Sequence, residues 1–181
     1  DVATDEIDRA LQMFTDIAGQ RPGAPDAFWW LATSRLSNAL IDKGRYEDAL
    51  TLIPHAEAMA PTPQKRREIQ LRRISALTAL GKEELAINAL NSFIEENPDT
   101  PETMTAEFKL ARLLRETGNY VLASEHFDTV ANAEGAPGQL RYQAAIARGW
   151  SFMDAEEFEK AVEAFSTSAK LGQTREEQAR A

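Results

Sequence analysis

Side chains that could support catalysis are few and scattered in this sequence. His55 and His126 stand alone, without a second histidine at metal-ligand spacing, and the chain contains no cysteine. No serine, histidine and aspartate occur in an order or spacing that indicates a nucleophilic triad, and no glycine-rich loop could cradle a phosphate. The sequence therefore predicts a protein that is not an enzyme and has no catalytic residue, bound metal or cofactor.

Positive charge is concentrated in one short stretch. Five cations fall within it: Lys65, Arg66, Arg67, Arg72 and Arg73. A phosphate-bearing, carboxylate-bearing or polymeric anionic partner could use such a cluster. A solvated helix face that balances nearby acids produces the same pattern, so both interpretations stay open.

A second group combines arginine with aromatic side chains. Arg112 and Arg115 lie three residues apart on one helical face, beside Phe108. Guanidinium groups bind carboxylates with two hydrogen bonds, and arginine is over-represented at interaction hot spots. The group predicts contact with acidic and apolar groups of a partner. In the alternative interpretation, Phe108 packs between repeats and the arginines pair with Glu107, Glu116 or other neighbours.

The charge balance limits the class of partner. With 20 basic and 29 acidic residues the net charge is −9, which opposes general nucleic-acid binding and attachment to an anionic membrane surface. No apolar run approaches the roughly 20 residues needed to span a bilayer, so we expect no membrane insertion of this segment. The absence of cysteine suits an oxidising compartment, although many cytosolic proteins also lack it.

The positions of these residues are set by an internal repeat. Similar motifs begin at Gly44, Gly81, Gly118 and Glu156, and a fifth copy without its leading glycine begins at Glu6. Their central alanines are Ala10, Ala49, Ala86, Ala123 and Ala161, so the steps between copies are 37 to 39 residues. A period of this length indicates stacked supersecondary units.

Each copy predicts a pair of antiparallel helices. The glycines follow amphipathic stretches and would close a helix in the left-handed conformation, and a second helix then opens at Tyr46, Glu83 or Tyr120. The alanine three residues later allows the two helices to approach closely. Thr62-Pro63 and Thr100-Pro101 each place an N-cap before a proline at the first helical position, which predicts the start of the next pair.

These residues resemble the tetratricopeptide repeat. The matching positions are Leu36, Leu40, Gly44, Tyr46, Ala49, Ala56 and Pro61 in repeat 1; Leu77, Gly81, Ala86, Leu90 and Pro98 in repeat 2; Leu110, Ala111, Leu114, Gly118, Tyr120, Ala123 and Phe127 in repeat 3; and Gly149, Phe152, Phe158, Ala161 and Phe165 in repeat 4. Glu83 departs from the usual aromatic, and Glu156 replaces the turn glycine. The resemblance implies an all-α, right-handed solenoid of antiparallel helix pairs, with about nine to ten helices.

The repeat boundaries follow from the same comparison. A single array over residues 1–181 is expected to contain an unpaired second helix at 5–22, repeats at 26–61, 62–98, 100–134 and 137–172, and the start of a further helix at 174–181. Thr174 to Glu177 has the pattern of a capping box, which indicates that new helix. An array with these two ends is expected to be a fragment of a longer protein. Pro54 should kink or shorten the second helix of repeat 1.

The resemblance also implies a binding groove and a function. Groove-facing family positions correspond here to Leu71, Phe108, Arg112, Arg115, Ile146, Trp150 and Met153. They imply a scaffold that binds a protein or peptide partner with acidic and hydrophobic residues. A self-assembling structural module remains an alternative, as does a periplasmic segment of a bacterial export or polysaccharide-secretion apparatus. The repeats run about three residues beyond the family's usual 34, as in bacterial envelope-associated members, which favours the periplasm over the cytoplasm.

Overall fold

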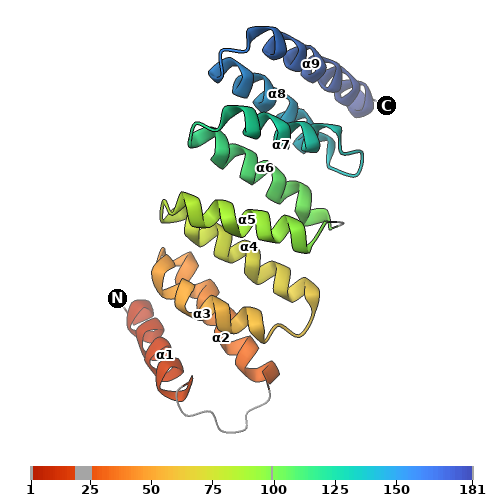
Figure 1. Cartoon of the computed structure of the whole chain (residues 1–181). Coiled ribbons are helices and arrows are strands. Elements are labelled where there is room, and N and C mark those ends of the chain that lie inside the picture. The colour runs from red at the N-terminus through yellow and green to blue at the C-terminus, as the bar shows by residue number, and fades with distance from the viewer. Residues whose placement is uncertain (1, 19–25, 99, 181) are drawn as a thin grey trace. The chain divides into compact units, whose positions relative to one another are not determined.

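The computed structural model describes residues 2–18, 26–98 and 100–180, and the side chains of residues 5–13, 29–98 and 100–172. Every regular element in these residues is an α-helix (Figure 1), which confirms the predicted all-α class. The helices are α1 (Val2–Ala18), α2 (Asp26–Asp42), α3 (Tyr46–Ala58), α4 (Pro63–Ala79), α5 (Glu83–Glu96), α6 (Pro101–Glu116), α7 (Tyr120–Asn132), α8 (Gly138–Asp154) and α9 (Phe158–Arg180).

The helices belong to two compact units. Unit 1 comprises residues 1–89, unit 2 comprises residues 90–181, and the boundary falls inside α5. In unit 1, α2 packs on α3 and α3 packs on α4; in unit 2, α6 packs on α7, α7 on α8 and α8 on α9. Packing between sequential neighbours is the pattern of a repeat protein, in which each helix pair buries its apolar face against the next.

The two helices of each repeat are joined by turns of one type. Gly44, Gly81 and Gly118 have φ values of 72°, 64° and 84°, so the predicted left-handed positions are confirmed. At each turn the backbone N–H of this residue bonds to the carbonyl three residues back, and the next N–H bonds to the carbonyl five residues back. These two bonds satisfy carbonyls that the end of the first helix would otherwise leave unpaired.

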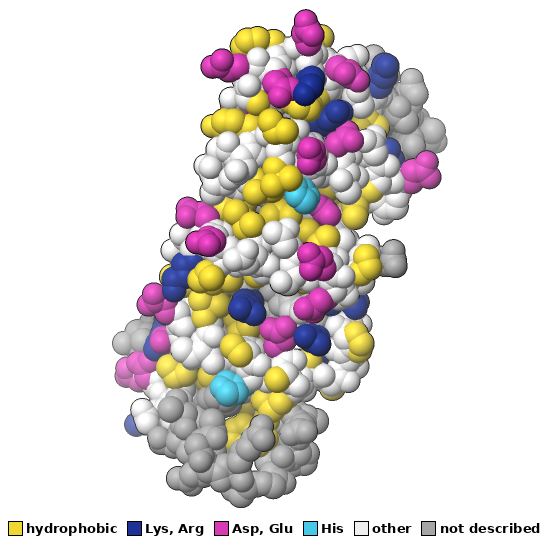
Figure 2. All heavy atoms as spheres, in the orientation of Figure 1, with side chains coloured by type: hydrophobic (Ala, Val, Ile, Leu, Met, Phe, Trp, Pro, Cys, Tyr) yellow, Lys and Arg dark blue, Asp and Glu magenta, His cyan; other side chains and the backbone are white. Residues whose placement is uncertain are grey.

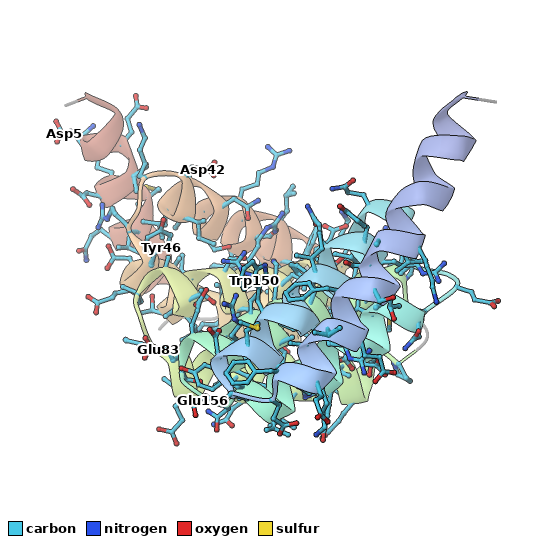
Figure 3. The ribbon with its side chains drawn as sticks, turned by 90° about the horizontal axis from the view of Figure 1, so that it is seen from above. Asp5, Asp42, Tyr46, Glu83, Trp150 and Glu156 are labelled. Atoms are coloured by element: carbon cyan, nitrogen blue, oxygen red, sulfur yellow. The ribbon has the colours of Figure 1, made fainter. Side chains whose placement is uncertain are left out.

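The turn between α8 and α9 uses a glutamate in place of glycine. Glu156 (Figure 3) has a φ of 60° and makes the same bond pattern, from Glu156 N to Met153 O and from Glu157 N to Phe152 O. A residue with a Cβ is strained in this conformation. The repeat geometry therefore holds the backbone in place against the local preference of the side chain.

The helices that open repeats 2 and 3 begin as the sequence predicts. Thr62 is the N-cap of α4, and its Oγ1 accepts a hydrogen bond from Lys65 N at 3.2 Å. Thr100 is the N-cap of α6, but its hydroxyl lies 2.9 Å from Thr103 Oγ1 instead of capping the helix. In both helices proline occupies the first position, where a missing N–H costs no hydrogen bond.

The repeated alanines lie where the helices of a pair approach each other. Ala49, Ala86, Ala123 and Ala161 are all completely buried, as the close-packing interpretation requires. The fifth copy differs, because Ala10 in α1 is exposed. No helix precedes α1 in the described part of the chain, so nothing there covers this side of it.

Helix α1 is held to unit 1 by apolar and charged contacts. Ile7 and Leu11 pack against a core cluster that includes Leu40 and Ile53. The Arg45 guanidinium pairs with Asp8 of α1 and with Asp48 of α3. The hydrogen bond to Asp8 and then that to Asp48 raise the pKa of Arg45.

The helix bounds correct one sequence expectation and test part of a second. Helix α9 runs without a break through Thr174, so the predicted new helix at that residue is wrong. The residues after Thr174 are mostly strong helix formers without proline, and they continue a helix as readily as they start one. Pro54 lies inside α3, yet α3 has 13 residues, as does α7. Pro54 therefore does not shorten α3 relative to α7, and the alternative of a kink stays a prediction.

Candidate functional site

One face of α6 carries the arginines that the sequence singles out. Phe108, Arg112 and Arg115 follow one another at intervals of four and three residues, which places them on one side of the helix. Leu110, Leu113 and Leu114 are buried in the core of unit 2. Because these leucines anchor the opposite side of α6, the arginine side remains accessible.

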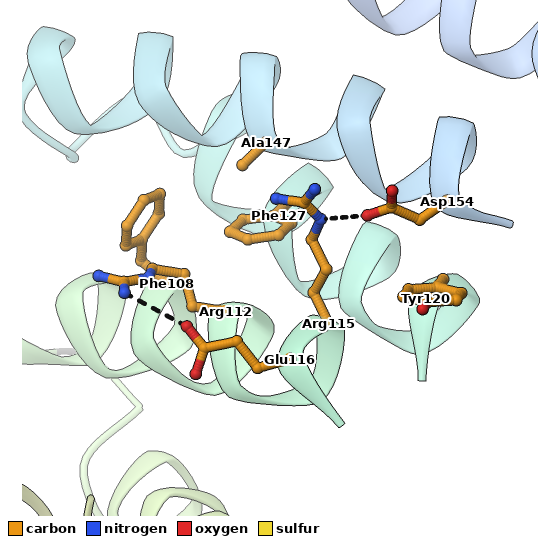
Figure 4. A pocket seen from close by; sticks show the side chains of 8 residues that line it. All are labelled: Phe108, Arg112, Arg115, Glu116, Tyr120, Phe127, Ala147 and Asp154. Carbon is orange, nitrogen blue, oxygen red and sulfur yellow. Dashed lines mark hydrogen bonds and ion pairs between the residues drawn. The ribbon is translucent and has the colours of Figure 1, made fainter. Parts of the chain in front are cut away.

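This face of α6 forms one wall of a pocket in unit 2. The pocket has a volume of about 490 Å³ and receives residues from α6, α7 and α8. Figure 4 shows its lining: Phe108, Arg112, Arg115, Glu116, Tyr120, Phe127, Ala147 and Asp154. Three of the seven groove residues implied by the family resemblance therefore line one cavity. A cavity of this size is within the range that holds a small ligand or a few peptide side chains.

Aromatic side chains support one side of the pocket. The rings of Phe108 and Phe127 meet edge to face, with centroids 5.4 Å apart. Phe127 is fully buried and Phe108 is half-buried. The contact fixes the Phe108 ring, so part of the pocket surface is apolar and already ordered.

The two arginines differ in how firmly they are held. Arg115 Nε donates to Asp154 Oδ2 at 2.6 Å, which links α6 to α8 (Figure 4). Arg112 Nη2 donates to Glu116 Oε1 at 3.4 Å within α6, and both side chains are largely exposed (62% and 59%). Exposed pairs of this kind contribute roughly 0–1 kcal/mol. Arg112 can therefore exchange Glu116 for an incoming carboxylate at little cost.

Helix α8 carries the other large groove residues. Trp150 is 49% exposed and Met153 is 38% exposed, whereas Ile146 is half-buried. The Trp150 ring (Figure 3) packs edge to face on Phe165 of α9, with centroids 5.3 Å apart. Trp150 lies between the pocket residues Ala147 and Asp154 along α8. It therefore offers a large, partly ordered apolar surface on the helix that closes the pocket.

Both sequence interpretations of this group describe part of the geometry. As the alternative expects, Arg112 pairs with Glu116. The ring contact of Phe108, however, is with Phe127 inside repeat 3 and not with a residue of another repeat. Glu107 instead pairs with His126, whose Nδ1 lies 2.6 Å from Glu107 Oε2. Exposure of Arg112 and Trp150 nevertheless leaves surface for a partner.

Acidic side chains lie beside several cations of the cluster Lys65–Arg73. Arg66 and Arg73 turn toward α3, where they lie 3.8 Å and 3.9 Å from carboxylate oxygens of Glu57. Lys65 pairs with Glu68 at 2.9 Å. Glu57 and Glu68 therefore offset part of the positive charge of the cluster. Their use by an anionic partner stays a prediction.

Charge is mixed on the visible surface as well. Acidic and basic side chains are interspersed over the face shown in Figure 2, with hydrophobic side chains between them. Leu71, the remaining groove residue, is half-buried in α4 of unit 1, and its role in binding stays a prediction. None of the described helices has the length and apolar character needed to cross a membrane.

Five residues that line the pocket were not among the expected groove residues: Glu116, Tyr120, Phe127, Ala147 and Asp154. The sequence analysis identified Tyr120 only as the aromatic residue that follows the turn glycine of repeat 3. Asp154 occupies in repeat 4 the position of Glu116 in repeat 3, two residues before the turn. That equivalence was the available signal, but the contact with Arg115 depends on how α8 packs beside α6.

Comparison with known proteins identifies the class to which this geometry belongs. Residues 71–139 match the sequence model of the tetratricopeptide repeat family. No curated protein matches the sequence. The fold of the chain is that of a tetratricopeptide-repeat protein, and the resemblance drawn from its repeats is confirmed.

Several solved structures share this fold at low sequence identity. A crystal structure of MamA is 18% identical with a TM-score of 0.67, over 96% of this chain and 93% of that one. Tetratricopeptide-like repeats of a kinesin light chain from Podosopora anserina are 15% identical with a TM-score of 0.68, over 96% and 88%. YrrB, described as a tetratricopeptide-repeat protein with an unusual peptide-binding site, is 20% identical with a TM-score of 0.64, over 94% and 80%.

Proposed function

We propose that the chain is a protein-interaction scaffold whose pocket in unit 2 binds a peptide segment bearing carboxylate and apolar side chains. The observation that carries the proposal is the pair Arg112 and Arg115 beside ordered aromatic rings, in a chain with a net charge of −9. Repeat folds of this class build extended binding surfaces from successive helices. The description of YrrB as peptide-binding supports the same kind of function.

The chemistry of the pocket favours a carboxylate ligand. Guanidinium groups bind carboxylates in a two-point geometry, which makes these pairs stronger and more directional than neutral hydrogen bonds. Arg112 gives up only a long exposed contact to Glu116 when a partner binds. Phe108 and Trp150 then provide apolar surface for the flanking side chains of the partner.

A binding experiment with defined peptides tests the proposal. The probes are short fluorescein-labelled peptides in which Asp or Glu alternates with Leu or Phe, and matched peptides with Asn or Gln in place of the acids. We expect saturable binding of the acidic set by fluorescence anisotropy. Arg112→Ala together with Arg115→Ala should weaken it by at least about tenfold, which corresponds to ~1.4 kcal/mol.

The same helix provides the matched control. Lys109 is an exposed cation of α6 that does not line the pocket, so Lys109→Ala removes a charge without touching the site. We expect its affinity to stay within about twofold of the unmodified protein. Equal weakening by Lys109→Ala, or equal binding of the neutral peptides, would contradict the pocket as the binding site.

Two finer proposals concern the character of the partner and the cellular compartment. We propose an acidic and hydrophobic partner because of the arginines and aromatics just described. The periplasmic or envelope location rests on the extended repeat length and the absence of cysteine. Fractionation of expressing cells into periplasm and cytoplasm tests that location, with recovery in the cytoplasmic fraction as the contrary result.

A further inference from the structure

The two arginines of the pocket belong to one repeat and are not part of the repeat pattern. The positions equivalent to Arg112 and Arg115 hold Asn38 and Ile41 in repeat 1, Ser75 and Thr78 in repeat 2, and Trp150 and Met153 in repeat 4. The helix pair therefore forms without a cation at either position. The side chains of Arg112 and Arg115 are 62% and 36% exposed, so a ligand can reach both.

Arg112 and Arg115 stand close enough to serve one group of a ligand. They lie three residues apart on α6 and line the same cavity. Side chains at this spacing are neighbours on a helix, with about 5–6 Å between their Cβ atoms. The guanidinium stems are longer than this separation. Two guanidinium groups can therefore converge on a single acidic group.

Each arginine keeps donors for this purpose. Arg115 uses Nε for Asp154 Oδ2 at 2.6 Å, so the edge formed by its two terminal nitrogens remains for a ligand. Arg112 turns toward Glu116 instead (Figure 4), through an exposed contact of 3.4 Å. That contact is weak, so Arg112 can leave it and turn toward the ligand of Arg115.

The charges of the pocket favour a ligand with more than one negative charge. The lining holds two cations, Arg112 and Arg115, and two acids, Glu116 and Asp154. A single carboxylate has two oxygens in one plane, which match one guanidinium group. It therefore replaces Glu116 on Arg112 and leaves Arg115 as it was. A phosphomonoester carries a charge of about −1.5 to −2 at pH 7 and three strong acceptor oxygens, so it can bond both arginines at once.

The other lining residues suit a phosphate that is attached to a side chain. The cavity of about 490 Å³ is larger than a phosphate ion alone needs, and the ring of Phe108, held by Phe127, gives it an apolar wall. In the view of Figure 4, Arg115 stands between Arg112 and Tyr120, whose hydroxyl is a further possible donor. The carbon atoms that link a phosphate to a peptide can pack on the aromatic wall.

We propose that the acidic group bound by the pocket is a phosphomonoester on a side chain of the partner, held jointly by Arg112 and Arg115. This inference rests on the proposed function, because it specifies the ligand of the same pocket. Phosphorylation of the partner peptide then controls its binding. Phosphoserine and phosphotyrosine share this chemistry and differ in the distance from the phosphate to the peptide backbone.

Peptides that differ at one residue test the proposal. The probes are fluorescein-labelled peptides with flanking Leu and Phe and a central serine, phosphoserine, tyrosine, phosphotyrosine or glutamate. Anisotropy titration of the whole protein should give at least about tenfold tighter binding of a phosphorylated peptide than of the glutamate peptide. Preference for phosphotyrosine over phosphoserine would assign the aromatic wall at Phe108 a part in recognition, and the reverse order would assign recognition to the phosphate alone.

A sixth peptide separates geometry from charge. It carries two consecutive glutamates, so its charge matches that of the phosphoserine peptide. Two carboxylates on separate side chains do not present three oxygens from one centre, and they lose more side-chain freedom on binding. We expect this peptide to bind at least about fivefold more weakly than the phosphoserine peptide.

Single substitutions test the joint role of the arginines. Arg112→Ala should weaken binding of the phosphoserine peptide by at least about tenfold and binding of the glutamate peptide by no more than about threefold, because only the phosphate needs both guanidinium groups. Arg112→Ala removes only an exposed pair, so the variant should keep its helicity. Lys109→Ala is the matched control on α6 and should leave both affinities within about twofold.

The pH dependence of binding reports the charge of the ligand. The second pKa of a phosphomonoester is about 6 and that of glutamate is about 4.3. Lowering the pH from 7.5 to 5.5 should therefore weaken the phosphoserine peptide by about fourfold and leave the glutamate peptide unchanged. The charged and titratable groups that line the pocket act on both peptides, so the glutamate peptide reports any contribution of the protein: Arg112, Arg115, Glu116, Tyr120 and Asp154.

The outcomes distinguish this inference from the proposed function. Phosphorylated peptides that bind no better than the glutamate peptide would overturn the inference alone. A double-glutamate peptide that equals the phosphoserine peptide would overturn it as well, because charge would then suffice. A preference for phosphate that survives Arg112→Ala would place the phosphate elsewhere. Absence of saturable binding by every acidic peptide would overturn both the inference and the proposed function.

Discussion

Helices α4 and α6 occupy equivalent positions in successive repeats, yet they differ in the charge that one face presents. Arg112 and Arg115 of α6 correspond to Ser75 and Thr78 of α4. The hydroxyls of Ser75 and Thr78 donate to backbone carbonyls of their own helix, at 3.0 Å and 2.9 Å. Arg115, by contrast, reaches Asp154 on α8. The repeat fixes where a side chain stands, and the residue type at an exposed position decides whether it can bind a partner.

The close packing of the helix pairs should be lost when the small residue at the contact is enlarged. Ala123 is fully buried between helices of a pair, so Ala123→Leu should overpack the site and lower the free energy of unfolding by about 3 kcal/mol. Urea titration followed by circular dichroism measures the change. Ala79→Leu is the matched control, because Ala79 is exposed at the end of α4. Equal loss in both variants would mean that the alanine is not a packing requirement.

A second difference between α4 and α6 concerns their buried polar groups. Glu107 of α6 is 8% exposed and pairs with His126 of α7, whereas the equivalent Gln70 of α4 donates to Glu57 of α3 at 3.1 Å. Removing the imidazole leaves a buried carboxylate without this partner, so His126→Ala should cost about 2 kcal/mol. Chemical denaturation checks the value. No loss of stability would show that water replaces the imidazole freely.

Substitutions at two equivalent turn positions should change stability in opposite directions. Gly118→Ala places a Cβ in the left-handed region and should destabilise the protein by about 1 kcal/mol, and Glu156→Gly should stabilise it by a similar amount. No atom lies within 4 Å of a Cβ built at Gly118, so the effect is conformational and not a clash. Thermal melts of the two variants against the unmodified protein measure it. Shifts of the same sign would refute the conformational explanation.

The smallest expected effect concerns the ion pair that bridges α6 and α8. Asp154→Ala removes the partner of Arg115 from a half-exposed pair, so stability should fall by only about 0.5 kcal/mol. The freed guanidinium should bind acidic peptides several-fold more tightly, because Asp154 no longer competes for it. Anisotropy titration measures this gain. Weaker binding would indicate that Asp154 orients Arg115 for the partner.

Local sequence patterns predicted the helix pairs and the turns between them well. Gly44, Gly81 and Gly118 were readable as left-handed turn positions because glycine is the residue that adopts this backbone freely. The buried alanines were readable because they recur at one step. The sequence wrongly predicted a new helix at Thr174, because the capping pattern there is also compatible with the interior of a helix.

The pocket was harder to predict than the helix pairs and their turns. Phe108, Arg112 and Arg115 share a helix face, which helical spacing alone reveals. Asp154 enters the pocket from α8, so its contact with Arg115 depends on the register of two packed helices. The exposure of Phe158 was missed for a different reason, since this residue matches the repeat and reads as a core residue, yet it is 58% exposed on α9.

An exchange of side chains between the two equivalent helices tests the central claim most directly. Arg112→Ser with Arg115→Thr gives α6 the residues of α4 at these positions, and isothermal titration calorimetry with an acidic, apolar peptide from the panel measures the affinity. The account predicts loss of binding by at least about tenfold, with stability lowered by no more than the small contribution of the Arg115–Asp154 pair. Undiminished affinity in the exchanged protein would contradict the assignment of the binding site to this pocket.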